Sequence, residues 1–205
     1  MAGKKILLMM IFETANRHFS FPEFLALAAE QVREYEAHPE SVSQPEYAFY
    51  TKLNLQRMKR ITKVFEPDAV LVALLRSMPK QDWWVITEPW CGDSAQNLPL
   101  IAALAEAAGI SLRIVLRDEN EQIMNNYLTK GGKSIPILVA FDAQGKTLFR
   151  WGPRPQAAQK LFLDWKESPR GRDFEAFELE MHQWYTQNRG QDTQAELKEI
   201  LQSLV

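Results

Sequence analysis

A single cysteine stands in the sequence Trp90-Cys91-Gly92-Asp93-Ser94, between a segment with strand character and a segment with helix character. A thiol in the first turn of a helix lies beside free backbone N–H groups and the positive end of the helix dipole, which both favour an anion. This position lowers the pKa of a thiol and makes a thiolate nucleophile available near neutral pH. Cys91 is therefore the candidate catalytic nucleophile. Because free cysteines are often small buried core residues, a purely structural role is the alternative.

Neighbouring charges should adjust the reactivity of this thiol. The Asp93 carboxylate, close behind the cysteine, would raise the pKa of the thiol by like-charge repulsion. Lys133 and Arg154 flank segments that should border the site, so their positive charges could offset that repulsion. The alternative for Asp93 is an exposed carboxylate that the helix dipole favours in the first turn.

The segment 46–65 is predicted to form a helix with an anomaly on its apolar face. At about 100° per residue, one arc of that helix contains the apolar side chains Tyr47, Tyr50, Leu53, Met58, Ile61, Val64 and Phe65. Asn54 and Arg57 project into the middle of this arc. A buried guanidinium needs a carboxylate or a ligand anion. We expect Arg57 to contact a carboxylate near Cys91, the candidates being Glu88, Asp93 and Asp118. A purely structural ion pair is the alternative.

The elements that must position these residues follow from periodicity, capping residues and turn residues. Before the cysteine we expect three helices: one that begins at Ser20 and ends before Pro39, and two more at 46–65 and 68–77. We expect strands at 82–87, 112–116, 137–141 and 147–151. Helices should fill 91–108 and 121–129 between the strands, and three more should follow at 156–167, 172–187 and 193–204.

Elements in the order β-α-β-α-β-β-α predict an α/β fold, in which a mixed four-stranded sheet has helices on both faces and helical additions at both ends. The parallel strands 82–87 and 112–116 should be adjacent. Their carboxyl ends then bring residues 88–91 and 117–120 to one edge of the sheet, where ligands tend to bind. We expect three regions within one compact unit: a helical extension (1–79), the core (80–168) and a C-terminal helical extension (169–205).

Residues 80–165 resemble the thioredoxin superfamily in several motifs at matching separations. Trp90-Cys91-Gly92 has the form of the redox motif, Pro99 stands where thioredoxins kink the following helix, and Gly152 follows the last strand. Ser134-Ile135-Pro136 resembles the segment that carries the cis-proline. More narrowly, residues 87–93 and 151–155 are similar to a bacterial branch of thioredoxin-like proteins with a helical N-terminal extension.

This resemblance implies a thioredoxin-like fold and a groove for an extended peptide. The groove residues would be Trp90, Ile135, Pro136 and Gly152. The Ile135–Pro136 peptide bond should be cis and should lie beside Cys91. Ile135, before the proline, would offer backbone hydrogen bonds to a bound peptide, as an added strand does.

Two departures from the thioredoxin pattern restrict the chemistry. Ser94 stands where the resolving cysteine belongs, and Val85 stands where thioredoxins keep a buried aspartate. A dithiol–disulfide cycle within one chain is therefore impossible. What remains is attack by Cys91 on a disulfide of a protein or small-molecule partner, followed by release through an external thiol such as glutathione. Ser94 could hydrogen-bond the Cys91 thiolate.

Two other functions stay open at this point. The first is a peptide-binding module that keeps the groove without turnover. The second rests on Cys91-Gly92-Asp93-Ser94, which resembles the Cys-Gly-Phe-Ser of monothiol glutaredoxins. In that family one protein cysteine and glutathione bind a [2Fe–2S] cluster across a dimer. Trp90, directly before the cysteine, favours the thioredoxin side.

Composition excludes several other classes. The chain has 205 residues, with 24 Lys and Arg against 26 Asp and Glu, so it lacks the positive charge of a general nucleic-acid binder. The longest apolar run, residues 6–12, is far shorter than the roughly 20 residues that span a bilayer. This run and Lys4-Lys5 resemble a signal peptide only weakly, so we expect a short strand or a partly buried segment. One cysteine fits a reducing compartment, so we expect a cytoplasmic protein. The histidines lack metal-ligand spacing: His18, His38 and His182.

Overall fold

A computed structural model describes residues 9–41 and 43–204, and the chain divides by contacts into two compact units. The first unit is Met1–Pro153 and the second is Arg154–Val205. The N-terminal helices therefore belong to the same unit as the sheet, while the helix at 156–167 groups with the C-terminal helices. The regions expected from the sequence have other boundaries, after residues 79 and 168.

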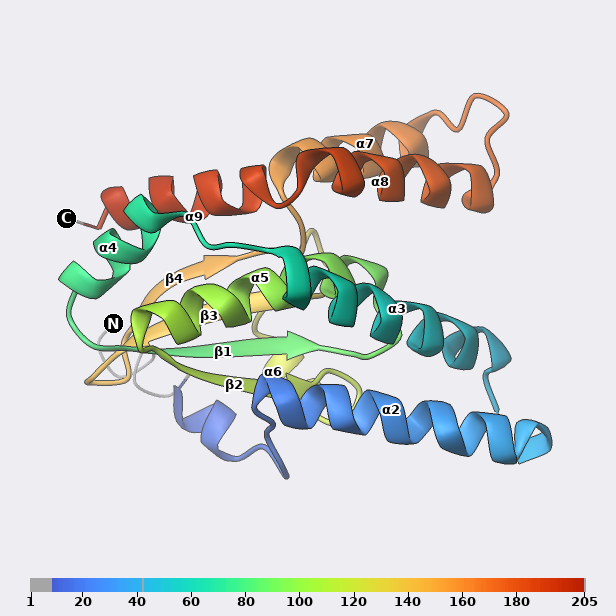
Figure 1. Ribbon diagram of the computed structural model, residues 1–205, viewed down its shortest axis with the longest axis horizontal. Coiled ribbons are helices and arrows are strands. Elements are labelled where there is room, and N and C mark those ends of the chain that lie inside the picture. Colours follow the sequence, from blue (N-terminus) through green and yellow to red (C-terminus); the bar gives the residue numbers. More distant parts are fainter. Residues whose placement is uncertain (1–8, 42, 205) are drawn as a thin grey trace. The chain divides into compact units, whose positions relative to one another are not determined.

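The first unit is built on one mixed sheet of four strands, β1 (Gln81–Thr87), β2 (Ser111–Leu116), β3 (Ile137–Asp142) and β4 (Thr147–Trp151). Their order is β2-β1-β3-β4 (Figure 1). β1 and β2 are parallel, whereas β3 is antiparallel to both β1 and β4. This arrangement confirms the predicted α/β fold and the adjacency of the two parallel strands.

The two faces of the sheet are covered by different elements (Figure 1). Successive residues of a strand point to opposite faces. Trp84 and Ile86 of β1 join a core cluster that includes side chains of α6 (Glu121–Met124). The opposite face is covered by α5 (Gly92–Ala108), which ends at the left-handed Gly109. The sheet thus has helices on both faces, and α5 begins where β1 ends.

The N-terminal helices form for local reasons that the sequence shows. α2 (Phe21–Ala37) begins with a capping box, in which Ser20 and Glu23 exchange hydrogen bonds. The short 3₁₀ helix η1 (Pro39–Ser41) follows. α3 (Pro45–Val64) starts with proline, and Asp68 caps α4 (Ala69–Ser77). All three predicted helices are confirmed within a residue or two. α3 packs on α5, and α2 packs on α3 (Figure 1).

Of the two alternatives for the apolar segment near the N-terminus, the described residues exclude the strand and agree with a partly buried segment. Residues 9–13 are helical, while Lys4-Lys5 and the first part of the apolar run lie outside the described residues. The Phe12 side chain is 1% exposed. Its ring centroid lies 5.2 Å from that of Trp84, 5.6 Å from that of Tyr127 and 5.7 Å from that of Phe141. Phe12 is therefore a full member of the core beneath the sheet.

The helix predicted at 121–129 is wrong beyond its first turn. α6 ends at Met124, and the chain continues through turns to a bridge between Thr129 and Gly132. The Asn126 side chain donates to the backbone oxygen of Gln122 at 2.8 Å. Asparagine favours such local bonds over helix continuation. The apolar spacing of this segment reflects burial of Tyr127, not a longer helix.

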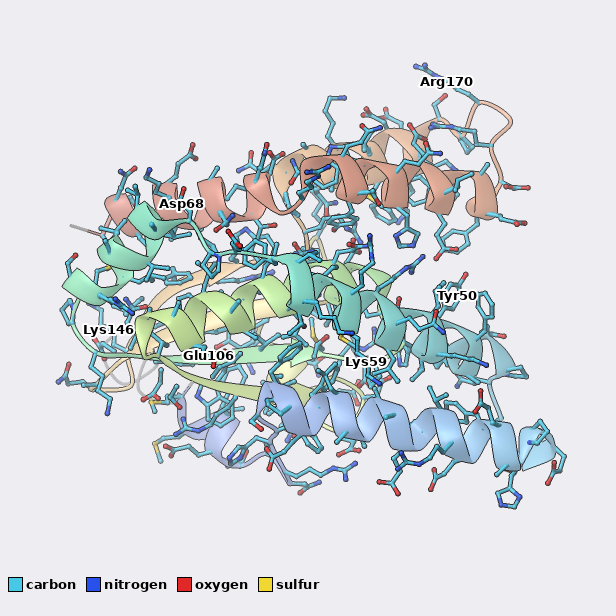
Figure 2. The ribbon with its side chains drawn as sticks, in the orientation of Figure 1. Tyr50, Lys59, Asp68, Glu106, Lys146 and Arg170 are labelled. Carbon is cyan, nitrogen blue, oxygen red and sulfur yellow. The ribbon has the colours of Figure 1, made fainter. Side chains whose placement is uncertain are left out.

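The second unit consists of α7 (Gln156–Glu167), α8 (Phe174–Asn188) and α9 (Gln191–Gln202), as the sequence predicts. The turn between α7 and α8 contains Arg170 (Figure 2), whose φ of 52° is left-handed. The rings of Trp165 and Phe177 stack at 4.5 Å and join the two helices. None of the helices in the described part of the chain is long and apolar enough to span a membrane.

Phe12→Ala should destabilise the protein by about 3–5 kcal/mol, because it removes a buried ring and leaves a cavity among aromatic neighbours. Met10→Ala is the matched control, since Met10 is 55% exposed. Denaturant unfolding of both variants measures the free energies. Equal stability of Phe12→Ala and the wild type would show that residues 9–13 do not complete the core.

Candidate active site at the start of α5

Cys91 occupies the N-cap of α5, with φ −77° and ψ 119°. The residue is 8% exposed. Its Sγ donates a hydrogen bond to the backbone oxygen of Ile135 at 3.3 Å, and its side chain does not cap the helix. The Ile135–Pro136 peptide bond is cis, as predicted, and it lies beside the cysteine. Because a carbonyl oxygen only accepts hydrogen bonds, this contact belongs to the protonated thiol.

Ser94 lies in the first turn of α5 and is buried. The Thr87 hydroxyl at the end of β1 donates to Ser94 Oγ at 2.5 Å. The position of a resolving cysteine is therefore filled by a buried pair of hydroxyl groups. A hydrogen bond from Ser94 to the Cys91 thiolate stays a prediction.

Trp90 lies between elements that are distant in sequence. The Tyr47 ring from α3 stacks on the Trp90 indole, with centroids 4.5 Å apart and planes 13° apart. The Arg117 guanidinium carbon lies 4.7 Å from the Trp90 ring centroid. Arg117 is itself held by the Asp118 carboxylate, with an Nε to Oδ1 distance of 2.7 Å. The residue before Cys91 is thus fixed by a stacked aromatic ring and a cation–π contact.

Glu88 carries a buried carboxyl group, 6% exposed, in the loop before the cysteine. Its Oε1 accepts a hydrogen bond from the Asp118 backbone N–H at 2.8 Å, and its backbone oxygen accepts from the Cys91 N–H at 3.2 Å. Burial raises the pKa of Glu88 to about 7. The charges of Asp118 and Glu119 add to the rise, whereas the Asp118 N–H bond and the Arg117 charge oppose it.

Asn54 connects α3 to this loop. The residue is fully buried, and its Nδ2 donates to the Pro89 oxygen at 3.2 Å. Its Oδ1 accepts a hydrogen bond from Arg57 Nη1 at 3.0 Å. Arg57 is half-buried, less than the sequence predicts. The two polar residues on the apolar face of α3 therefore support the loop before Cys91, and a direct contact of Arg57 with a carboxylate stays a prediction.

The remaining charged candidates have diverse surroundings. Lys133 Nζ forms an ion pair with Glu121. Asp93 is half-buried in the first turn of α5, and its backbone oxygen accepts from Asn97 Nδ2 at 2.9 Å. Arg154 belongs to the second unit, and its guanidinium carbon lies 4.6 Å from the centroid of the Phe162 ring. The expected compensation of Asp93 by Lys133 and Arg154 stays a prediction.

The backbone of Gly152 lies close to the carbonyl oxygen of the cis-proline, Pro136. Its φ is 113°, and a Cβ at this position would collide with the Pro136 carbonyl oxygen. Ile135 and Pro136 are buried and Trp90 is half-buried. The structure thus brings Trp90, Cys91, Ile135 and Pro136 together, with Gly152 behind the proline; peptide binding there stays a prediction.

Sequence reasoning missed the partners that hold Trp90. Tyr47 and Arg117 gave only weak signals, an aromatic residue on the apolar arc of α3 and a basic residue directly after β2. Within the described residues no three His, Cys, Asp or Glu side chains gather as a metal site.

A four-stranded mixed sheet, a cysteine at the start of the helix after β1 and a cis-proline facing it define a protein with the thioredoxin fold. Residues 41–167 match the family model described as thioredoxin, and this chain belongs to that family. A search of curated proteins found no match.

Two solved structures are similar to most of the chain. A protein of unknown function from Pseudomonas aeruginosa has a TM-score of 0.57 and 15% sequence identity, over 95% of this chain and 96% of that chain. An HIV epitope scaffold has a TM-score of 0.52 and 16% identity, over 90% of this chain and 99% of that chain. At these identities the likeness concerns the fold alone.

Glu88 should make the stability of the protein depend on pH. Its pKa is about 7 in the folded protein against an ordinary value of 4.5. The folded state therefore holds the proton more tightly, and stability falls as pH rises from about 4.5 to about 7, by up to about 3 kcal/mol. Glu88→Gln carries no charge, so it should remove this fall. Glu106→Gln on the exposed surface of α5 (Figure 2) is the control. Urea unfolding from about pH 5 to about pH 8 measures the free energy of unfolding at each pH. If this free energy falls with pH in Glu88→Gln as steeply as in the wild type, the prediction is wrong.

Gly152→Ala should cost about 3 kcal/mol or more, because left-handed strain adds to a collision with the Pro136 oxygen. Gly109→Ala is the matched control. Gly109 also has a positive φ, 71°, but a Cβ there meets no atom within 4 Å. It should therefore cost only about 1–2 kcal/mol. Thermal and denaturant unfolding compare the two variants. Similar losses in both would mean that the approach of Gly152 to the proline contributes nothing.

Proposed function

We propose that this protein is a thioredoxin-like protein of monothiol type, with Cys91 as the nucleophile in thiol–disulfide exchange. The observation that carries the proposal is the position of Cys91 Sγ, at the first turn of α5 and 3.3 Å from the Ile135 oxygen beside the cis-proline. A nucleophile at a helix N-terminus, next to a strand end that can bind an extended peptide, is suited to attack a disulfide in that peptide.

The reaction needs one protein sulfur. The Cys91 thiol loses its proton, and the thiolate attacks one sulfur of a partner disulfide. A mixed disulfide with Cys91 forms, and the second partner sulfur leaves as a thiolate that takes up a proton. The thiolate of an external thiol then attacks the partner sulfur of the mixed disulfide and regenerates the Cys91 thiolate. The reaction has two products. One partner sulfur is released as a thiol, and the other is joined to the external thiol in a disulfide.

Binding and deprotonation would be coupled at Ile135. In the structure the Ile135 oxygen accepts the Cys91 thiol proton. Loss of that proton leaves the carbonyl available to a backbone N–H of an extended peptide. A partner that docks as an added strand would therefore favour the thiolate directly beside its own disulfide.

The proposed partners are a protein or small-molecule disulfide and an external thiol such as glutathione. A chain with one cysteine suits a reducing compartment, which supports the bacterial cytoplasm as the site of action.

A peptide-binding module without turnover is the second candidate. The observation in its favour is the same thiol, which is 8% exposed and whose hydrogen bond to Ile135 uses its proton. The rate of Cys91 alkylation as a function of pH separates the candidates. A midpoint clearly below about 8.5, the ordinary pKa of a cysteine, supports exchange, whereas a midpoint at or above this value supports the module.

The purified protein should not reduce insulin disulfides in an assay coupled to thioredoxin reductase, because no second cysteine can release the mixed disulfide. With excess glutathione it should turn over slowly, and Cys91→Ser should abolish that turnover. Efficient reductase-coupled reduction by the wild type, or glutathione-dependent turnover that persists in Cys91→Ser, would overturn the monothiol proposal.

A further inference from the structure

A pocket of about 470 Å³ lies beside the candidate active site, in the first unit. The end of α2, η1, the start of α3 and the loop after β2 form its walls. The lining residues that matter here are Glu34, Tyr35, His38, Gln44, Tyr47 and Asp118. Its volume is in the range of small-ligand sites and can hold one long side chain together with its backbone.

Two contacts connect this pocket to the residues around Cys91. The Tyr47 ring, which lines the pocket, stacks at 4.5 Å on Trp90, the residue bonded to Cys91. Asp118, which also lines the pocket, donates its backbone N–H to the buried Glu88 carboxyl group at 2.8 Å. A molecule in the pocket would therefore lie against the same residues that support the cysteine.

The lining of the pocket has the chemistry of a cation site. Glu34 and Asp118 contribute carboxylates, and Tyr35 and Tyr47 contribute aromatic rings. Burial raises the pKa of the Tyr35 phenol, and the negative charges of Glu34 and Glu88 raise it further. Carboxylates together with aromatic faces favour an ammonium or guanidinium group.

The ion pairs around the pocket leave one of its carboxylates available to a cation. Arg117 pairs with Asp118, and the His38 imidazole lies 3.7 Å from the Glu40 carboxylate. In the described part of the chain, the exposed Glu34 carboxylate has no ion-pair partner. Glu34 is thus the carboxylate that an incoming cation can neutralise.

We propose that this pocket binds a lysine or arginine side chain of the disulfide partner, close in sequence to the cysteine that Cys91 attacks. The inference rests on the proposed function and names its substrate class, a basic peptide disulfide. Occupation of the pocket would hold the partner against Tyr47, which stacks on Trp90, and so raise the effective concentration of its disulfide at Cys91.

The first experiment measures exchange rates with Cys91 for two peptide disulfides that differ only in an arginine or a glutamine near the reacting cysteine. The wild type should react about three- to tenfold faster with the arginine peptide, as expected for one exposed ion pair and one cation–π contact. Glu34→Gln should lose most of this preference. Glu36→Gln on the same helix should keep it, because Glu36 lies outside the pocket lining and pairs with Lys52 at 2.7 Å.

A second measurement separates failure of the pocket from failure of the proposed function. Calorimetry of the wild type with a cysteine-free arginine peptide tests the pocket alone. Binding that Glu34→Gln weakens and Glu36→Gln preserves supports it. An uncharged small disulfide, 2-hydroxyethyl disulfide, tests exchange at Cys91 alone. If it reacts while the wild type shows neither binding of the arginine peptide nor preference for arginine, the pocket inference is wrong and the exchange function stands. If it does not react, the exchange function is wrong, and calorimetry still decides whether the pocket binds the basic peptide.

Discussion

The antiparallel register of β1 and β3 pairs Ile86 with Ile137, and this pairing places the two halves of the site together. The chain leaves β1 directly toward Cys91 and enters β3 directly from the cis-proline. The Cys91–Ile135 hydrogen bond joins these two ends. A shift of one residue would turn every side chain of a strand to the other face, and the two faces pack against different elements, so side-chain packing fixes the register. The position of the thiol is therefore a consequence of core packing.

The helix α3 completes the site, and the matched family region, residues 41–167, includes it. α3 lies on α5 and contributes Asn54 to the Pro89 carbonyl and Tyr47 to the Trp90 ring. A buried loop carbonyl without a donor is costly, typically about 1–3 kcal/mol. Asn54, one of two polar residues on the apolar face of α3, prevents that cost. The sheet, α5 and α3 thus pack together, and the helical extension supports the loop before the cysteine.

Local signals in the sequence were sufficient for most of the fold. Ser20 predicts the start of α2 and Gly109 predicts the end of α5. The motif around Cys91 together with Ser134-Ile135-Pro136 predicts the family and the cis-proline. The failures involve partners that only the tertiary structure selects. Phe12 reaches the core from a segment too short to show periodicity, and the stack of Tyr47 on Trp90 depends on how α3 is rotated. The length of α6 depends on side-chain bonds of asparagine, which compete with the helix and leave no trace in hydrophobic spacing.

The replacement of the second cysteine is better understood as a change of chemistry than as a loss of structure. Ser94 is part of the buried hydrogen-bond structure, because Thr87, the last residue of β1, donates a hydrogen bond to its hydroxyl group. Val85, which stands where the resemblance to thioredoxins implies a buried aspartate, is completely buried. The titratable carboxyl group is instead Glu88, which lies in the loop and accepts the Asp118 N–H beneath the Arg117–Trp90 contact. The buried carboxyl group with a raised pKa therefore lies in the loop at the edge of the sheet, bonded to Asp118, which also lines the pocket. In the proposed reaction with one sulfur, no proton passes between two thiols of the chain, so Glu88 would act only through its charge on a partner that approaches this edge.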